Sequence, residues 1–125
     1  MFIAAACAGN AQPQPRQFGQ CAEPWQVELL RPKIPAFEYL AGLRDDYTGP
    51  LSFFDVLARG HDKSSLEGRL AVWLLTASKR IIHGYIVAAD RDQGRLILQA
   101  IEDETRLNPW LARQIEVQRP YVRLL

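Results

Sequence analysis

The second half of the chain carries three apolar runs divided by short polar segments, and this pattern constrains the fold more than any other feature. The runs cover residues 70–75, 81–89 and 96–101. The segments between them, 76–80 and 90–95, are polar, and the second contains Gly94. Apolar runs with β-branched and aromatic residues, separated by polar turns, are typical of consecutive antiparallel hairpins. We therefore predict a three-stranded meander.

The residues around the meander predict shorter elements. Residues 114–117 and 121–125 alternate or cluster as two short strands, and Asn108 precedes a single helical turn over 109–112. Apolar residues also recur at helical spacing over 36–43. After Pro50, apolar residues recur every three positions, at Leu51, Phe54 and Leu57. The last two patterns predict two short helices, the second ending near residue 60.

The first fifty residues differ in composition from the rest. Residues 8–16 are rich in Gln, Pro and Gly without an apolar period, which predicts disorder. Prolines alternate with Trp25 and other apolar residues over 24–35, which favours an extended arm that docks either on its own domain or on a partner. The predicted organisation is an irregular extension over 1–50, with one possible short helix, followed by one folded domain over 51–125.

Charge and cysteine content narrow the class of protein. Fifteen Lys and Arg residues against fourteen Asp and Glu residues give a net charge of +1, so no global basic field attracts nucleic acid. Cys7 and Cys21 have neither zinc-site spacing nor the density of a secreted disulfide scaffold. We expect an intracellular protein, cytoplasmic or nuclear, that does not span a membrane.

Several motifs within residues 66–125 resemble the Sm and LSm family. Its first motif is similar to Gly68-Arg69, then Gly84-x-Ile86-x-x-Ala89-Asp90, and then Leu96-Ile97-Leu98. Its second motif is similar to the Arg119-Pro120 turn between the last two strands. The resemblance implies a mainly β fold, a small five-stranded Sm-like (SH3-like) barrel preceded by one or two short helices and the irregular arm.

The same resemblance assigns structural roles to Gly68, Gly84, Asp90 and Gly94. A strand bent sharply enough to serve both halves of a small barrel needs a residue without Cβ, which predicts such a bend at Gly84. The chain departs from RNA-binding members of the family in two places. Residues 90–95 contain no Asn, and the usual Arg-Gly turn is Arg119-Pro120.

The resemblance implies a non-enzymatic scaffold subunit of a ribonucleoprotein or of a complex that assembles spliceosomal ribonucleoproteins, as for the Gemin subunits of the SMN complex. Such a subunit pairs with other Sm-fold proteins through its edge strands in a hetero-oligomer. Two alternatives stay open, an auxiliary subunit of the NatC N-terminal acetyltransferase and a divergent LSm ring subunit that binds RNA.

Candidate site residues follow from these hypotheses. RNA-contact candidates are Arg91, Arg95, Arg119 and His83, against the alternative that they are solvated surface groups. Partner-interface candidates are Trp25, Trp73, Val117 and Val122. No residue pattern predicts a catalytic group, a cofactor or a small-molecule substrate. No metal site is predicted either, because no His or Cys lies at ligand spacing from His61.

Overall fold

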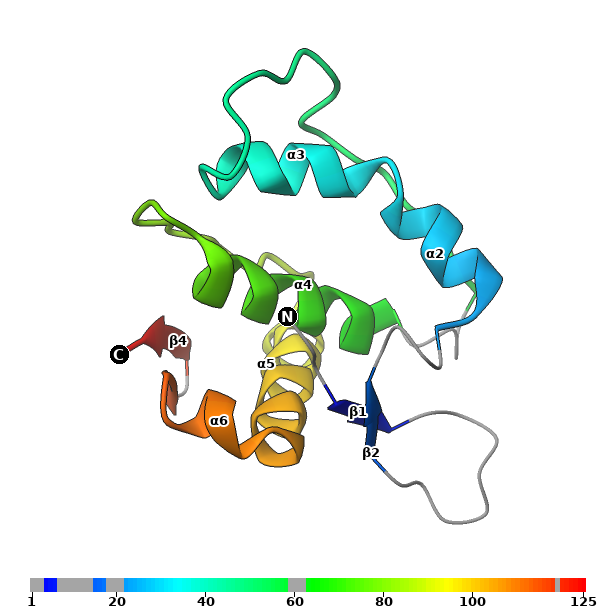
Figure 1. Ribbon diagram of the computed structural model, residues 1–125. Coiled ribbons are helices and arrows are strands. Elements are labelled where there is room, and N and C mark those ends of the chain that lie inside the picture. The colour runs from blue at the N-terminus through cyan, green and yellow to red at the C-terminus, as the bar shows by residue number, and fades with distance from the viewer. Residues whose placement is uncertain (1–3, 7–14, 18–21, 59–62, 119) are drawn as a thin grey trace.

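The computed structural model describes residues 4–6, 15–17, 22–58, 63–118 and 120–125 (Figure 1). In chain order, its elements are β1 (Ala4–Ala6), β2 (Pro15–Gln17), α2 (Pro24–Leu30), α3 (Lys33–Leu40), α4 (Lys63–Ala77), α5 (Arg91–Leu107), α6 (Pro109–Ala112), β3 (Ile115–Gln118) and β4 (Tyr121–Leu124). The strands form two separate antiparallel pairs, β1 with β2 and β3 with β4. Helices make up about half of the described residues, far more than the strands.

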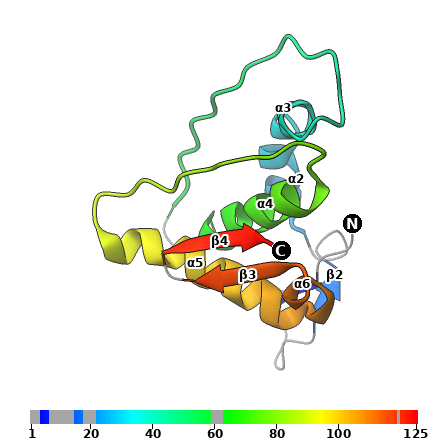
Figure 2. The ribbon, with the colours of Figure 1, turned by 90° about the vertical axis from the view of Figure 1, so that its left-hand side faces the viewer.

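The centre of the molecule is the pair α4 and α5, which pack against each other. Their shared core consists of Val72, Ile101, Leu111 and Ile115, and it brings in α6 and β3. The hairpin of β3 and β4 lies against the same helices, as Figure 2 shows. The core therefore draws its side chains from both long helices and the C-terminal hairpin.

The sequence of α4 suits a helix whose buried residues recur at a three-residue spacing. Leu66, Arg69 and Val72 are all buried, and most residues between 66 and 77 are good helix formers. Gly68 lies on the same side, where an added Cβ would come within 2.9 Å of the Ala100 Cβ. The glycine therefore lets α4 approach α5 closely.

Side chains cap both ends of α5, Asp90 at its start and Asn108 at its end. The Asp90 carboxylate accepts a hydrogen bond from the backbone N–H of Gln93 at 2.8 Å, which satisfies a free donor of the first turn. At the other end, the Asn108 side chain donates to the Glu104 carbonyl at 2.7 Å. Asn108 also precedes Pro109, the first residue of α6, so one residue ends a helix and begins the next.

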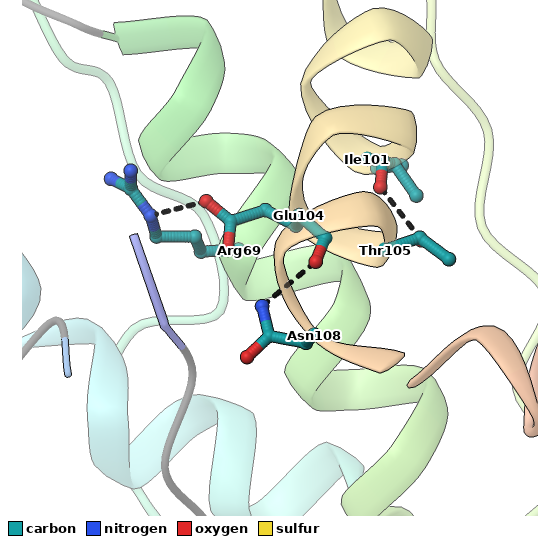
Figure 3. A network of polar contacts seen from close by, with 5 residues as sticks. All are labelled: Arg69, Ile101, Glu104, Thr105 and Asn108. Atoms are coloured by element: carbon teal, nitrogen blue, oxygen red, sulfur yellow. Dashed lines mark hydrogen bonds and ion pairs between the residues drawn. The ribbon is translucent and has the colours of Figure 1, made fainter. Parts of the chain in front are cut away.

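A buried ion pair joins the two long helices. Arg69 Nε lies 2.7 Å from Glu104 Oε1, and the two side chains are only 9% and 4% exposed. Figure 3 shows this pair beside the Asn108 bond and the bond from the Thr105 hydroxyl to the Ile101 carbonyl. The pair fixes the rotation of α5 relative to α4, because two buried charges must face each other.

Helices α2 and α3 form a separate layer above α4 in Figure 1. Glu23 and Gln26 cap the start of α2 reciprocally, and Pro24 occupies its first position. Lys79 donates its backbone N–H to the Ala41 carbonyl at 2.8 Å, which ties the end of α3 to the end of α4. The helix predicted over 36–43 lies at Lys33–Leu40, and the extended arm predicted over 24–35 is wrong, because residues 24–30 form α2 with Pro24 at its first position.

The predicted five-stranded barrel is wrong. Residues 70–75 and 96–101 are helical, in α4 and α5, and residues 81–89 form neither helix nor strand but run as a long open trace (Figure 2). The apolar run 70–75 is continuous and holds one β-branched residue, so its periodicity does not separate a strand from a buried helix. The run 96–101 is one stretch of a helix whose polar side faces solvent.

The helix predicted after Pro50 is also wrong. Residues 51–58 are extended, and burial alternates along them, with Phe53, Asp55 and Leu57 partly covered and the residues between them exposed. The helical turn over 109–112 begun by Asn108 is confirmed, and so are the two short strands near the C-terminus. None of the described helices is long and apolar enough to cross a membrane.

The structural glycines have other surroundings than the barrel implies. Gly68 lies inside α4 and Gly94 inside the first turns of α5. The bend predicted at Gly84 depends on the barrel, and an added Cβ there would meet no atom within 4 Å. Asp90 is a helix cap rather than part of a loop between strands.

Two matched substitutions test the close approach at Gly68. In Gly94→Ala the methyl enters open space, and the better helix propensity of alanine raises the free energy of unfolding by about 0.5–1 kcal/mol. In Gly68→Ala the methyl meets Ala100, so the helices must separate and the free energy of unfolding falls by about 1 kcal/mol. Urea denaturation of both variants measures the contrast. Equal stabilisation by both substitutions would show that a methyl group fits between α4 and α5 at Gly68.

The buried ion pair predicts a strong asymmetry between single and double variants. Glu104→Ala leaves the Arg69 guanidinium buried without its carboxylate and lowers the free energy of unfolding by about 3–5 kcal/mol. Asp103→Ala, which removes an exposed partner of Arg106 in the same helix, changes it by less than about 1 kcal/mol. The double variant Arg69→Met/Glu104→Leu recovers much of the loss, again measured by urea denaturation. A Glu104→Ala effect no larger than that of Asp103→Ala would contradict this role.

Candidate protein-interaction surface

The connection between α4 and α5 is a long extended segment. It leaves α4 at residue 78 and reaches the cap of α5 at residue 90, and Figure 2 shows it as an open trace between the two helices. β-branched Ile81, Ile82, Ile86 and Val87 favour extended backbone over helix. We call residues 81–89 the extended segment.

One face of the extended segment is apolar and almost fully exposed. Ile81, Tyr85 and Val87 are 91%, 90% and 92% exposed. These odd-numbered residues project to one side of an extended chain, because side chains alternate along it. Ile82 on the other side is partly covered. Gly84, Ile86 and Ala88 are exposed as well, so within the segment only Ile82 is partly covered and the rest is open to solvent.

The backbone of the extended segment lacks partners within the part of the chain that the structure describes. None of residues 81–89 donates or accepts a backbone hydrogen bond there. Unpaired N–H and C=O groups in extended conformation are a template on which another strand adds. Exposed apolar side chains and a free strand edge thus occur in the same nine residues.

Residues 51–58 form a second extended stretch with outward apolar side chains. Phe54 is 92% exposed and Val56 is 80% exposed. Asp55 points the other way and forms an ion pair with Lys33 of α3, whose side chain is 8% exposed. This pair holds the stretch on α3 and leaves the two apolar side chains outward.

The charges around the extended segment are unevenly distributed. Lys79 and Arg80 precede it, and Asp90 and Asp92 follow it with Arg91 between them, all exposed. The segment itself carries no Lys, Arg, Asp or Glu. One end is basic and the other is net acidic, with an apolar stretch between.

The predicted RNA contacts do not gather around a pore. Arg91 and Arg95 lie one turn apart at the start of α5, and Arg95 forms an ion pair with Asp92 at 3.4 Å. His83 is exposed on the extended segment. Arg119 lies outside the described residues. The described arginines are therefore solvated helix side chains, partly neutralised by a neighbouring carboxylate.

The predicted partner contacts divide between half-buried and inward positions. Trp25 and Trp73 are each half-buried, and the Trp25 indole N–H donates to Glu23 Oε2 at 2.7 Å. Val117 and Val122 oppose each other in the hairpin and pack against the core. The valines therefore stabilise the fold, and the most exposed apolar side chains lie elsewhere in the chain.

Sequence reasoning missed the exposed side chains of Tyr85, Val87, Phe54 and Val56 as a surface. The pattern around Tyr85 and Val87 predicts a strand, the pattern around Phe54 predicts a helix, and in both cases apolar residues are ordinarily assigned to a core. Nothing in the local sequence states that no second strand covers them. Residues 81–89 could be recognised as uncovered only if the flanking runs 70–75 and 96–101 were first recognised as helices, because no strand would then be left beside them.

No group of three His, Cys, Asp or Glu side chains among the described residues is arranged to hold a metal ion. His61, Cys7 and Cys21 lie outside those residues. No protein-family model matches the chain, and no curated protein or solved structure matches it either. The extended segment is therefore interpreted from its own geometry.

The ion pair under residues 51–58 gives a direct test of how they are held. Asp55→Ala removes the carboxylate that faces the buried Lys33 ammonium and lowers the free energy of unfolding by about 1–3 kcal/mol. Glu28→Ala breaks the Glu28–Arg31 pair, whose side chains are 68% and 69% exposed, and changes it by less than about 0.5 kcal/mol. Thermal or urea unfolding distinguishes the two. Similar small effects would mean that Lys33 reaches water when Asp55 is lost.

Proposed function

We propose that this chain is a non-enzymatic binding subunit that joins a protein assembly by strand addition through residues 81–89. The observation that carries the proposal is the coincidence of three almost fully exposed apolar side chains with a backbone that makes no hydrogen bond among the described residues. The helical body around Val72 and Ile101 serves as the support that holds the segment extended.

The energetics favour a protein partner. Covering a large apolar side chain stabilises a complex by about 1.5–3 kcal/mol, so Ile81, Tyr85 and Val87 together supply several kcal/mol. A strand laid beside residues 81–89 also gives partners to the unpaired backbone groups. RNA bases can stack on an exposed ring such as Tyr85, but RNA has no strand edge to pair with the backbone of residues 81–89.

The role of a scaffold subunit is retained from the sequence hypothesis, but its partners are redefined. Pairing with Sm-fold proteins, in a ribonucleoprotein or as an acetyltransferase auxiliary subunit, depended on a barrel with open edges. With that barrel absent, the partner is defined by chemistry, as a protein with a free strand edge and an apolar face. An intracellular location, expected from Cys7 and Cys21, is part of the proposal.

A photo-crosslinking amino acid placed in the full-length chain tests the proposal. Benzoylphenylalanine replaces Tyr85 on the extended segment or, as a matched control, Tyr121 of β4, which is 48% exposed. After irradiation in cells, we expect a discrete protein adduct from position 85 and none from position 121. Mass spectrometry identifies the crosslinked polypeptide.

Two outcomes contradict the proposal. Equal labelling from positions 85 and 121 would show that the segment has no selective partner. An adduct with RNA instead of protein at position 85 would favour the nucleic-acid alternative and would draw Arg91 and His83 back into consideration.

A further inference from the structure

We infer that the extended segment pairs antiparallel with the same segment of a second copy of this chain, about a two-fold axis at Gly84. The inference rests on the proposed function and names its partner. It follows from three properties of the segment, namely its residue order, its flanking charges and the surroundings of Gly84.

Residues 81–87 read Ile-Ile-His-Gly-Tyr-Ile-Val, which is nearly the same in residue class in both directions. Two β-branched aliphatic residues and one ring precede Gly84, and one ring and two β-branched aliphatic residues follow it. A two-fold interface requires such self-complementarity, because residue i of one copy meets residue j of the other and j meets i. A segment built for an unrelated strand has no such requirement.

The symmetric register pairs like with like. Ile81 lies opposite Val87 of the second copy, Ile82 opposite Ile86, and His83 opposite Tyr85, with each pair repeated by the axis. Directly opposite residues of an antiparallel pair share a face, so the exposed side chains Ile81, Tyr85 and Val87 come together on one face. Aromatic and β-branched cross-strand pairs are those that stabilise sheets most.

The charges at the two ends favour the antiparallel direction. Lys79 and Arg80 of one copy come beside the end of the other that carries Asp90 and Asp92. In this register Arg80 lies opposite Ala88 and diagonally across from Asp90. A parallel pair would instead place Lys79 and Arg80 beside their own copies, where like charges repel.

Gly84 is explained by the axis and not by the fold of one chain. An added Cβ at this position would meet no atom within 4 Å, and its φ is not positive. The single chain therefore does not need glycine here, and glycine weakens a strand. On the axis, each Gly84 lies opposite the other, and a glycine inside a strand is typical of a site where another backbone approaches closely.

Cysteine crosslinking tests the register directly. In a full-length chain carrying Cys7→Ser and Cys21→Ser, Gly84→Cys places two thiols opposite each other, where Cα atoms about 4.5–5.5 Å apart suit a disulfide. We expect rapid formation of a disulfide-linked dimer under mild oxidation. Gly94→Cys, at the other glycine with open space around it, is the control and should stay mainly monomeric.

The off-axis positions sharpen the test. Val87→Cys should not link to itself, because the two thiols would be about 20 Å apart along the strands. A mixture of Ile81→Cys and Val87→Cys chains should link to each other. Crosslinking of Val87→Cys to itself as fast as Gly84→Cys would overturn the proposed register.

Sedimentation of the unmodified protein tests the association without a disulfide. We expect a monomer–dimer equilibrium that shifts to monomer in Ile81→Asp/Val87→Asp, with unchanged circular dichroism because both side chains are exposed. A protein that stays monomeric, with no Gly84→Cys dimer, overturns the self-pairing. If position 85 then crosslinks to a different protein in cells, the proposed function stands without it, and if no protein is labelled, both fail.

Discussion

The Arg69–Glu104 pair is the interaction on which the arrangement of this chain depends. It joins the two long helices at a point where both side chains are almost fully buried, so each charge needs the other. The core around Val72 and Ile101 forms on the same contact, and the hairpin and α6 pack on that core. Apolar packing supplies most of the stability, whereas the ion pair restricts the two helices to one rotation.

The same pair marks one place where the local sequence pattern misassigns the second half. Residues 102–104 are acidic, and an acidic triplet after an apolar run is ordinarily a turn. Glu104 is instead a core position of α5, matched by an arginine 35 residues earlier, and nothing local reveals that match. Where the signal is local, as for Asn108 before Pro109 and for the two C-terminal strands, the prediction holds.

The candidate surface shows that local sequence does not determine whether a segment is covered by other parts of the chain. Extended backbone over residues 81–89 follows from Ile and Val content, but whether an extended run is covered depends on its neighbours. With α4 and α5 as helices, no strand of the described chain lies beside it, and Tyr85 and Val87 remain exposed. The strand predicted at 81–89 is therefore not formed within the described chain, and the same residues become a candidate binding segment.

Asn108 also has a consequence for how the chain opens. Because this one residue caps α5 and starts α6, the end of the first helix cannot fray without releasing the second. The C-terminal hairpin is attached through α6, so local opening there spreads to the core in a single cooperative step. Backbone amide hydrogens in residues 100–117 would then exchange at one common rate. Those of α2 and α3, which make fewer contacts with the rest of the fold, would exchange at different rates.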